Sequence, residues 1–138
     1  MLSIRTLIAP RITAHAHCYI PCGIYDPAAA KTAADTVVKM VEKIQSFSQG
    51  TCDIDRNNYI RSVNVKEEHA QICKRELLIL WTDYLKPEHL EKYPKLHDTF
   101  WKAAKLCSKN KQSVDAAAAT ELQSAVKEIS DIFWATKK

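Results

Sequence analysis

Glycine is scarce in this chain, which has two glycines and five prolines among its 138 residues. Folds rich in β-sheet need many tight turns, and these two residue types supply most of them, so their scarcity favours long helices. No apolar run approaches the roughly 20 residues that a membrane-spanning helix needs. A chain of this length can enclose one substantial core but not two, so we expect a single all-α domain.

A strong excess of one charge is also missing. The formal net charge is +4, and the lysines and arginines are spread among the aspartates and glutamates. A nucleic-acid-binding surface needs a concentrated basic patch, so we expect neither a nucleic-acid partner nor a membrane partner.

The five cysteines do not form a disulfide pattern, because their number is odd and Cys52, Cys73 and Cys107 have no regular spacing. Cys73 and Cys107 fall among apolar positions of helical periodicity, and we interpret both as small buried hydrophobic residues. Cys52 lies in a polar stretch and is assigned no role. The remaining two, Cys18 and Cys22, lie in one short segment near the N-terminus.

Apolar residues recur at three- and four-residue steps in four segments, which predicts four amphipathic helices. Asp26 and Pro27 suit the start of the first helix, and Pro87 marks the end of the second. We expect a polar loop at 48–58, a connector with room for one helical turn at 87–94, and a helix break at 109–111. The expected helices are residues 28–47, 59–86, 95–108 and 113–135. With mostly short connections, they predict an antiparallel four-helix bundle.

Residues 1–16 differ from the rest of the chain in composition. They contain arginine, serine and threonine but no acid, and they end in Ala-His-Ala, which is similar to a processing site. Pro10 and Arg11 interrupt the short apolar stretch, so a secretory signal fits poorly. A transit peptide fits the composition, and an ordinary N-terminus is the plain alternative. A pro-peptide removed on maturation fits better, because its removal changes the chemistry of His17.

The run from His17 to Pro27, His-Cys-x-x-Pro-Cys-Gly-x-Tyr-Asp-Pro, resembles the metal-binding hook of the nickel superoxide dismutases. Three other stretches are also similar to that family: LWTDYLKP at 80–87, EKYPKLH at 91–97 and IFWATKK at 132–138. The resemblance covers nearly the whole chain. It implies a leader at 1–16, cut before His17, and a four-helix-bundle enzyme domain at 17–138 with its hook at 17–25.

The resemblance also implies the function. Such an enzyme converts superoxide to dioxygen and hydrogen peroxide by Ni(II)/Ni(III) cycling, with one nickel ion per subunit. It implies a homohexamer with each hook at a subunit contact, and a maturation protease. Tyr25 and Tyr84 are expected near the open face of the metal, although a tyrosine on an apolar helix face is more often a core residue with a bonded hydroxyl. We expect a cytoplasmic location, with organelle targeting by the leader left open.

Chelate chemistry explains why the hook needs the cut. Cleavage before His17 frees an α-amine with a pKa of about 8, and a metal readily displaces its proton. The backbone nitrogen of Cys18 and the thiolates of Cys18 and Cys22 complete a planar set, while the His17 imidazole can bind axially. Two nitrogens and two sulfurs in a plane suit nickel(II) or copper(II), whereas zinc prefers a tetrahedral site. Pro21 and Gly23 favour the turn that this requires.

The chain departs from the family at the support of the axial histidine. Some members hold it with a glutamate from the first helix and an arginine from the second, and the matching positions here are Ala33 and His69. His69 is therefore our candidate for orienting His17. Two other interpretations stay open: a non-enzymatic nickel or copper carrier that uses the same hook, and a helical interaction module with incidental cysteines.

Overall fold

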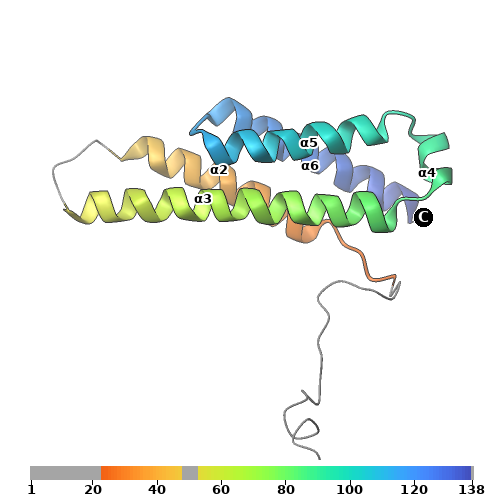
Figure 1. Cartoon of the computed structure of the whole chain (residues 1–138), viewed down its shortest axis with the longest axis horizontal. Coiled ribbons are helices and arrows are strands. Elements are labelled where there is room, and N and C mark those ends of the chain that lie inside the picture. Colours follow the sequence, from red (N-terminus) through yellow and green to blue (C-terminus); the bar gives the residue numbers. More distant parts are fainter. Residues whose placement is uncertain (1–22, 48–52, 138) are drawn as a thin grey trace, which may run out of the picture.

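The computed structural model of the protein describes residues 23–47 and 53–137. Over these residues the chain is helical, with no strand: α2 (Ala28–Ser46), α3 (Asp53–Ile79), the π-helical turn η1 (Leu80–Tyr84), α4 (Pro87–Lys92), α5 (Leu96–Gln112) and α6 (Ala116–Thr136). The four long helices lie side by side, and α4 forms a short connector at one end (Figure 1). Both α2 and α5 contact α3 and α6, which closes the bundle. This confirms the predicted four-helix bundle.

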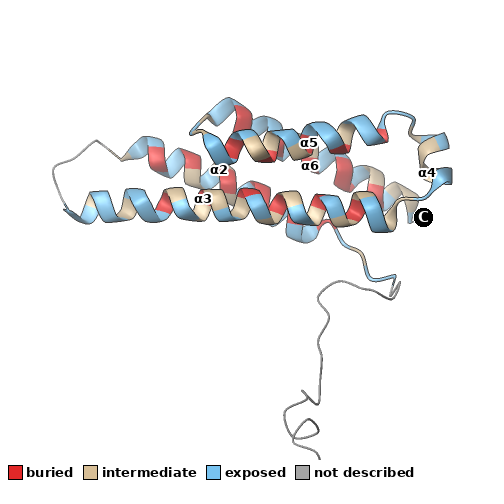
Figure 2. Cartoon of the chain, in the orientation of Figure 1, coloured by how far each residue is buried: buried red, intermediate tan, exposed pale blue. Residues whose placement is uncertain are grey.

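The core lies on the axis of the bundle, where all four long helices turn their apolar stripes inward (Figure 2). Its large members include Val37 and Val41 of α2, Leu77 of α3, Phe100 of α5 and Phe133 of α6. Among the described helices, none is long and apolar enough to cross a membrane.

Cys73 and Cys107 occupy adjacent positions in this core. They belong to α3 and α5, are free thiols and are fully buried, which confirms their interpretation as small buried hydrophobic residues. The hydrogen bond between the two thiols, together with burial, raises the pKa of Cys73.

The first helix begins as predicted. The Asp26 carboxylate accepts a hydrogen bond of 2.7 Å from the backbone N–H of Ala28. Pro27 directly precedes the helix, where its lack of a backbone N–H costs no helical hydrogen bond. The start of the second helix was predicted wrongly, because α3 begins at Asp53 instead of Tyr59. Its first turns are mostly exposed, so they carry no apolar stripe, but Asp53 and Asp55 interact favourably with the helix dipole.

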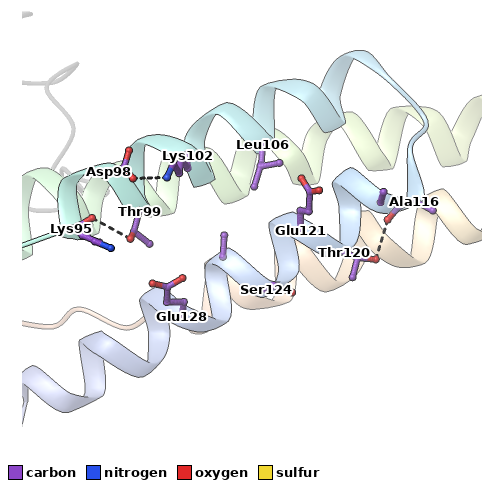
Figure 3. Close-up of a pocket in the computed structure, with 12 residues that line it drawn as sticks. Lys95, Asp98, Thr99, Lys102, Leu106, Ala116, Thr120, Glu121, Ser124 and Glu128 are labelled. Carbon is purple, nitrogen blue, oxygen red and sulfur yellow. Dashed lines mark hydrogen bonds and ion pairs between the residues drawn. The ribbon is translucent and has the colours of Figure 1, made fainter. Parts of the chain in front are cut away.

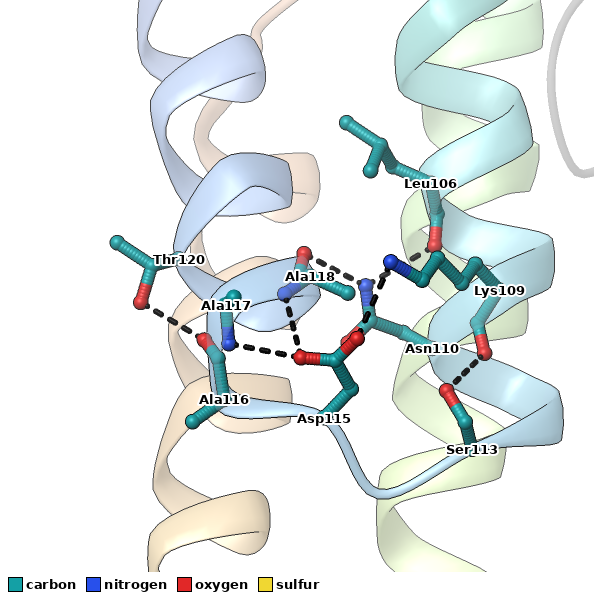
Figure 4. A network of polar contacts seen from close by, with 9 residues as sticks. All are labelled: Leu106, Lys109, Asn110, Ser113, Asp115, Ala116, Ala117, Ala118 and Thr120. Carbon is teal, nitrogen blue, oxygen red and sulfur yellow. Dashed lines mark hydrogen bonds and ion pairs between the residues drawn. The ribbon is translucent and has the colours of Figure 1, made fainter.

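The predicted break at 109–111 is also wrong, because α5 continues to Gln112. Asn110 is fully buried, and its side-chain amide donates to the carbonyls of Leu106, at 3.0 Å, and Ala118, at 2.9 Å (Figure 4). The polar residues that suggested a loop thus bond within the bundle. The buried ammonium of Lys66, on α3, donates to the backbone carbonyls of Asn110, Lys111 and Ser113 and so closes the end of α5.

The last helix begins at Ala116, three residues later than expected, because Asp115 is its N-cap. The Asp115 carboxylate accepts from the N–H groups of Ala117, at 2.9 Å, and Ala118, at 3.1 Å, and pairs with the Lys109 ammonium at 3.1 Å (Figure 4). The bond from Ala118 and the Lys109 ammonium lower the pKa of this carboxyl.

The long second helix ends in a wider turn. In η1 the N–H of Leu85 donates to the carbonyl of Leu80, five residues back, at 3.2 Å. The predicted end at Lys86 is two residues too late, because Leu85 and Lys86 are extended, as the residue before Pro87 must be. The expected helical turn in the connector is α4. Such π-turns frequently occur at functional sites, and this one carries Tyr84.

Candidate metal centre

The three expected metal ligands, His17, Cys18 and Cys22, lie outside the described residues. The structure begins at the next residue, Gly23, whose backbone φ is +69°. Residues that carry a side chain rarely adopt this left-handed backbone conformation. A Cβ added at Gly23 meets no atom within 4 Å, so the backbone angle, and not a lack of space, explains why glycine suits this position. Gly23 therefore gives the chain, within the expected hook, a backbone conformation that other residues rarely adopt.

Two segments far apart in the sequence meet just after this turn. The Tyr25 ring, which precedes α2, lies 5.6 Å from the Tyr84 ring at the end of η1, with 55° between the ring planes. Both tyrosines are half-buried at the edge of the core. The structure thus brings together the two tyrosines that the sequence singled out.

Tyr84 is held on several sides. Its ring lies 4.5 Å from the Phe133 ring and stacks on the His89 imidazole at 5.4 Å, with 25° between the planes. Its hydroxyl is 2.7 Å from the hydroxyl oxygen of Thr136. The bonded hydroxyl also fits the ordinary alternative of a core tyrosine, so its packing alone assigns no chemistry.

Lys137, at the end of α6, contacts the backbone of Tyr25 in the segment that precedes α2. Its ammonium donates to the Tyr25 carbonyl at 3.0 Å and lies over the rings of Phe133, at 4.8 Å, and Trp134, at 5.6 Å. A positive charge therefore stands beside the tyrosine pair. Thr136 and Lys137 belong to the family-like ending at 132–138, but neither was a predicted site residue.

His69 lies elsewhere on the bundle. Its ring Nδ1–H donates to the Val65 carbonyl, one turn back on α3, at 2.9 Å. It stands fifteen positions before Tyr84, about 22 Å along a helix axis. The structure therefore does not bring His69 and the tyrosine pair together within one chain. Within 23–47 and 53–137, no group of three histidine, cysteine or acidic side chains could hold a metal.

A hollow of about 910 Å³ opens between α5 and α6 (Figure 3). Its walls carry charges of both signs, and an ion pair of 2.6 Å joins Asp98 to Lys102 across one turn of α5. Tyr25, Tyr84 and His69 do not line it.

Comparison with known proteins gives consistent matches. The family model of nickel-containing superoxide dismutase matches residues 12–137. The proteins named superoxide dismutase [Ni] from Streptomyces seoulensis and Streptomyces coelicolor are each 39% identical to this chain over 132 residues, which is 96% of both chains in each pair. A native nickel superoxide dismutase structure has a TM-score of 0.77 and 37% identity, and covers 88% of this chain and 100% of its own. A structure with the nickel ligation of the oxidized state has a TM-score of 0.77 and 38% identity, and covers 88% and 98%.

Proposed function

This chain belongs to the nickel-containing superoxide dismutases, and we propose that His17, Cys18 and Cys22 are its nickel ligands. It is an oxidoreductase that disproportionates superoxide to dioxygen and hydrogen peroxide, with nickel as its cofactor. The carrier interpretation is not favoured, because the relatives that match almost the whole chain are superoxide dismutases. The match of the family model to residues 12–137 is the observation that carries this conclusion.

The donor set fits nickel. Two thiols and an imidazole fall within six positions, and cleavage before His17 adds an α-amine. When bound, nickel supplies the one-electron redox chemistry, which thiolate and deprotonated amide donors make accessible. To hold the metal, the chain would release one proton from the α-ammonium of His17, one from the backbone amide of Cys18 and one from each of the two thiols. Gly23 supports this role, because it directly follows the expected ligand Cys22 and has the left-handed backbone conformation that tight turns often require.

We propose that Tyr25 and Tyr84 form the entrance to the metal. Their rings pack against each other at the edge of the core, and their hydroxyl groups can order water there. The Lys137 ammonium adds a positive charge beside Tyr25, which favours the approach of an anion such as superoxide.

The maturation and assembly of the enzyme are also proposals. Residues 1–16 are a leader that a protease removes, and the mature domain, residues 17–138, assembles as a homohexamer in the cytoplasm. His69 orients the His17 imidazole, in place of the glutamate and arginine that some other members of the family use.

The test uses two proteins that differ by one residue. One begins at His17, and the other carries a single additional alanine before His17. We expect the first to bind one nickel per subunit, to show nickel–sulfur bonding by X-ray absorption, and to dismutate superoxide. The second keeps its thiols and its helical circular dichroism but loses the activity, because it lacks an amine at His17.

The other outcomes separate the alternatives. A carrier binds nickel without turnover, and an interaction module binds none. Normal turnover by the alanine-extended protein shows that the amine is not a ligand. Absence of nickel–sulfur bonding in the protein that begins at His17 excludes Cys18 and Cys22 as ligands.

A further inference from the structure

The hydrogen bonds around Tyr84 have a fixed direction. The Thr136 hydroxyl lies 2.7 Å from the Phe133 carbonyl oxygen, which can only accept, so the single hydroxyl proton of Thr136 is donated there. The Tyr84 and Thr136 hydroxyl oxygens are 2.7 Å apart. Since Thr136 has no second proton, Tyr84 must be the donor in that bond. Tyr84 therefore donates to Thr136, and Thr136 donates to the Phe133 carbonyl.

Packing reinforces this direction. The Tyr84 ring is fixed between the Phe133 ring, at 4.5 Å, and the stacked His89 imidazole, at 5.4 Å. A phenol O–H prefers to lie in the plane of its ring, so a fixed ring leaves the hydroxyl proton two preferred orientations. The Thr136 hydroxyl oxygen lies within hydrogen-bond distance of the Tyr84 hydroxyl oxygen. Hydrogen bonds in a chain polarise one another, which favours the arrangement in which every member donates in the same direction.

The direction decides what the phenol oxygen can offer to the site. With its proton committed to α6, Tyr84 presents lone pairs to other groups. An oxygen in that state accepts a hydrogen bond from water or from hydrogen peroxide, both of which have O–H donors. It does not donate to superoxide, which has none.

We propose that Thr136 is a positioning residue of the dismutation site, which holds the Tyr84 hydroxyl as a donor to α6 and thereby makes its oxygen an acceptor for bound water or hydrogen peroxide. This inference rests on the proposed placement of Tyr84 at the entrance to the metal. Thr136 acts only through Tyr84, which is the property that distinguishes it from a residue that merely stabilises the end of α6.

The first test measures the direction of the bond without nickel or activity. The Fermi doublet of tyrosine in the Raman spectrum distinguishes a phenol that donates from one that accepts, and the difference between wild type and Y84F isolates Tyr84. We expect a donor signature in wild type and in Thr136→Ser, and its loss in Thr136→Val. An acceptor signature for Tyr84 in wild type, or an unchanged signature in Thr136→Val, overturns the inference.

The second test measures dismutation by the nickel-loaded enzyme. We expect Thr136→Val to lower kcat/KM by about two- to tenfold, the range that the net contribution of one neutral hydrogen bond implies. Thr136→Ser should restore wild-type rates. Thr120→Val is the matched control, because Thr120 is an exposed residue of the same helix and makes the same kind of bond, 3.0 Å to the Ala116 carbonyl.

A double-mutant cycle links the two residues. If Thr136 acts through Tyr84, adding Thr136→Val to Y84F causes no further loss. Equal losses from Thr136→Val with and without Tyr84 overturn the inference. Full activity of Y84F overturns the kinetic role of both residues together, while the Raman result still decides the direction of the bond. A nickel-loaded wild type without activity contradicts the proposed function itself.

Discussion

Lys66 is a buried cation that donates hydrogen bonds to three backbone carbonyls. Its side chain lies on α3 and is 1% exposed, and its ammonium donates to the carbonyls of Asn110, Lys111 (3.2 Å) and Ser113 (3.0 Å). The last carbonyls of a helix lack partners within the helix, so this lysine satisfies the end of α5 from a neighbouring helix. Lys66→Met keeps most of the apolar stem but removes all three donors.

Losing the Lys66 ammonium has a different cost at each of the three carbonyls. Asn110 is fully buried, so its carbonyl has no access to water, and leaving such a group unsatisfied costs about 1–3 kcal/mol. Lys111 is exposed and its carbonyl can bond to water instead, while Ser113 is intermediate. Removal of the ammonium also relieves its own desolvation penalty, which offsets part of the loss. We expect a net decrease of about 2 kcal/mol in the free energy of unfolding, or about 8 °C in Tm for a chain of this size.

Thermal and urea unfolding followed by far-ultraviolet circular dichroism measure this decrease. All proteins are compared at one concentration and neutral pH, because subunit assembly adds to the apparent stability. Lys74→Met is the matched control: Lys74 also lies on α3, is only half-buried, and donates to one side chain of α5, the Ser108 hydroxyl, at 3.0 Å. The control should change by less than about 0.5 kcal/mol. If Lys66→Met is as stable as wild type, or no less stable than the control, the reasoning is refuted.

Four further predictions follow from the same structure. Burial lowers the pKa of Lys66, so the folded state loses this proton before the unfolded state does; the stability of wild type relative to Lys66→Met should rise as pH increases toward the ordinary lysine value, and parallel pH curves contradict this. The pKa of the Asp115 carboxyl is lowered, so the stability that this carboxylate contributes is complete above the ordinary aspartate pKa and is lost as pH falls through the folded-state pKa. The difference in stability between wild type and Asp115→Asn should therefore be smaller in acid than at neutral pH, as measured by unfolding curves. Cys73 and Cys107 should resist an alkylating reagent in the folded enzyme, and peptide mapping should find both labelled only after unfolding. Lys137→Met should lower kcat/KM mainly at low ionic strength, and an equal loss at high salt argues against attraction of the anion.

The helices could be predicted where local chemistry determines them. Asp26 and Pro27 define the start of α2, where the Asp26 carboxylate accepts a hydrogen bond from the N–H of Ala28, two residues later in the sequence. The apolar periodicity that follows marks the buried face of the helix. The continuation of α5 past Ser108 could not be predicted in this way. It depends on Lys66, which bonds to a carbonyl 44 positions away, and a local pattern of polar residues contains no sign of that partner.

The candidate site divides in the same manner. The nickel ligands were predicted from the resemblance of their segment to the family's hook, which chelate chemistry explains, and they stay predictions because they lie outside the described residues. Tyr25 and Tyr84 were chosen by family resemblance, and the structure brings them together. Thr136 and Lys137 had no role in the sequence analysis, because they meet the tyrosines across 52 and 112 positions of sequence. The family-like ending of the chain was the available signal.

The π-helical turn at Leu80–Tyr84 determines how this region responds to a change of length. It holds one more residue than a regular helical turn, because Leu85 bonds to the carbonyl of Leu80, five residues back. Deleting one residue within this turn can restore an ordinary helix and leave the residues after it close to their present direction. Deleting one residue from the regular part of α3 instead rotates everything after it by about 100°, which carries Tyr84 away from Tyr25. The contact between the two rings therefore depends on the number of residues in the regular helix, whereas the wider turn can lose one.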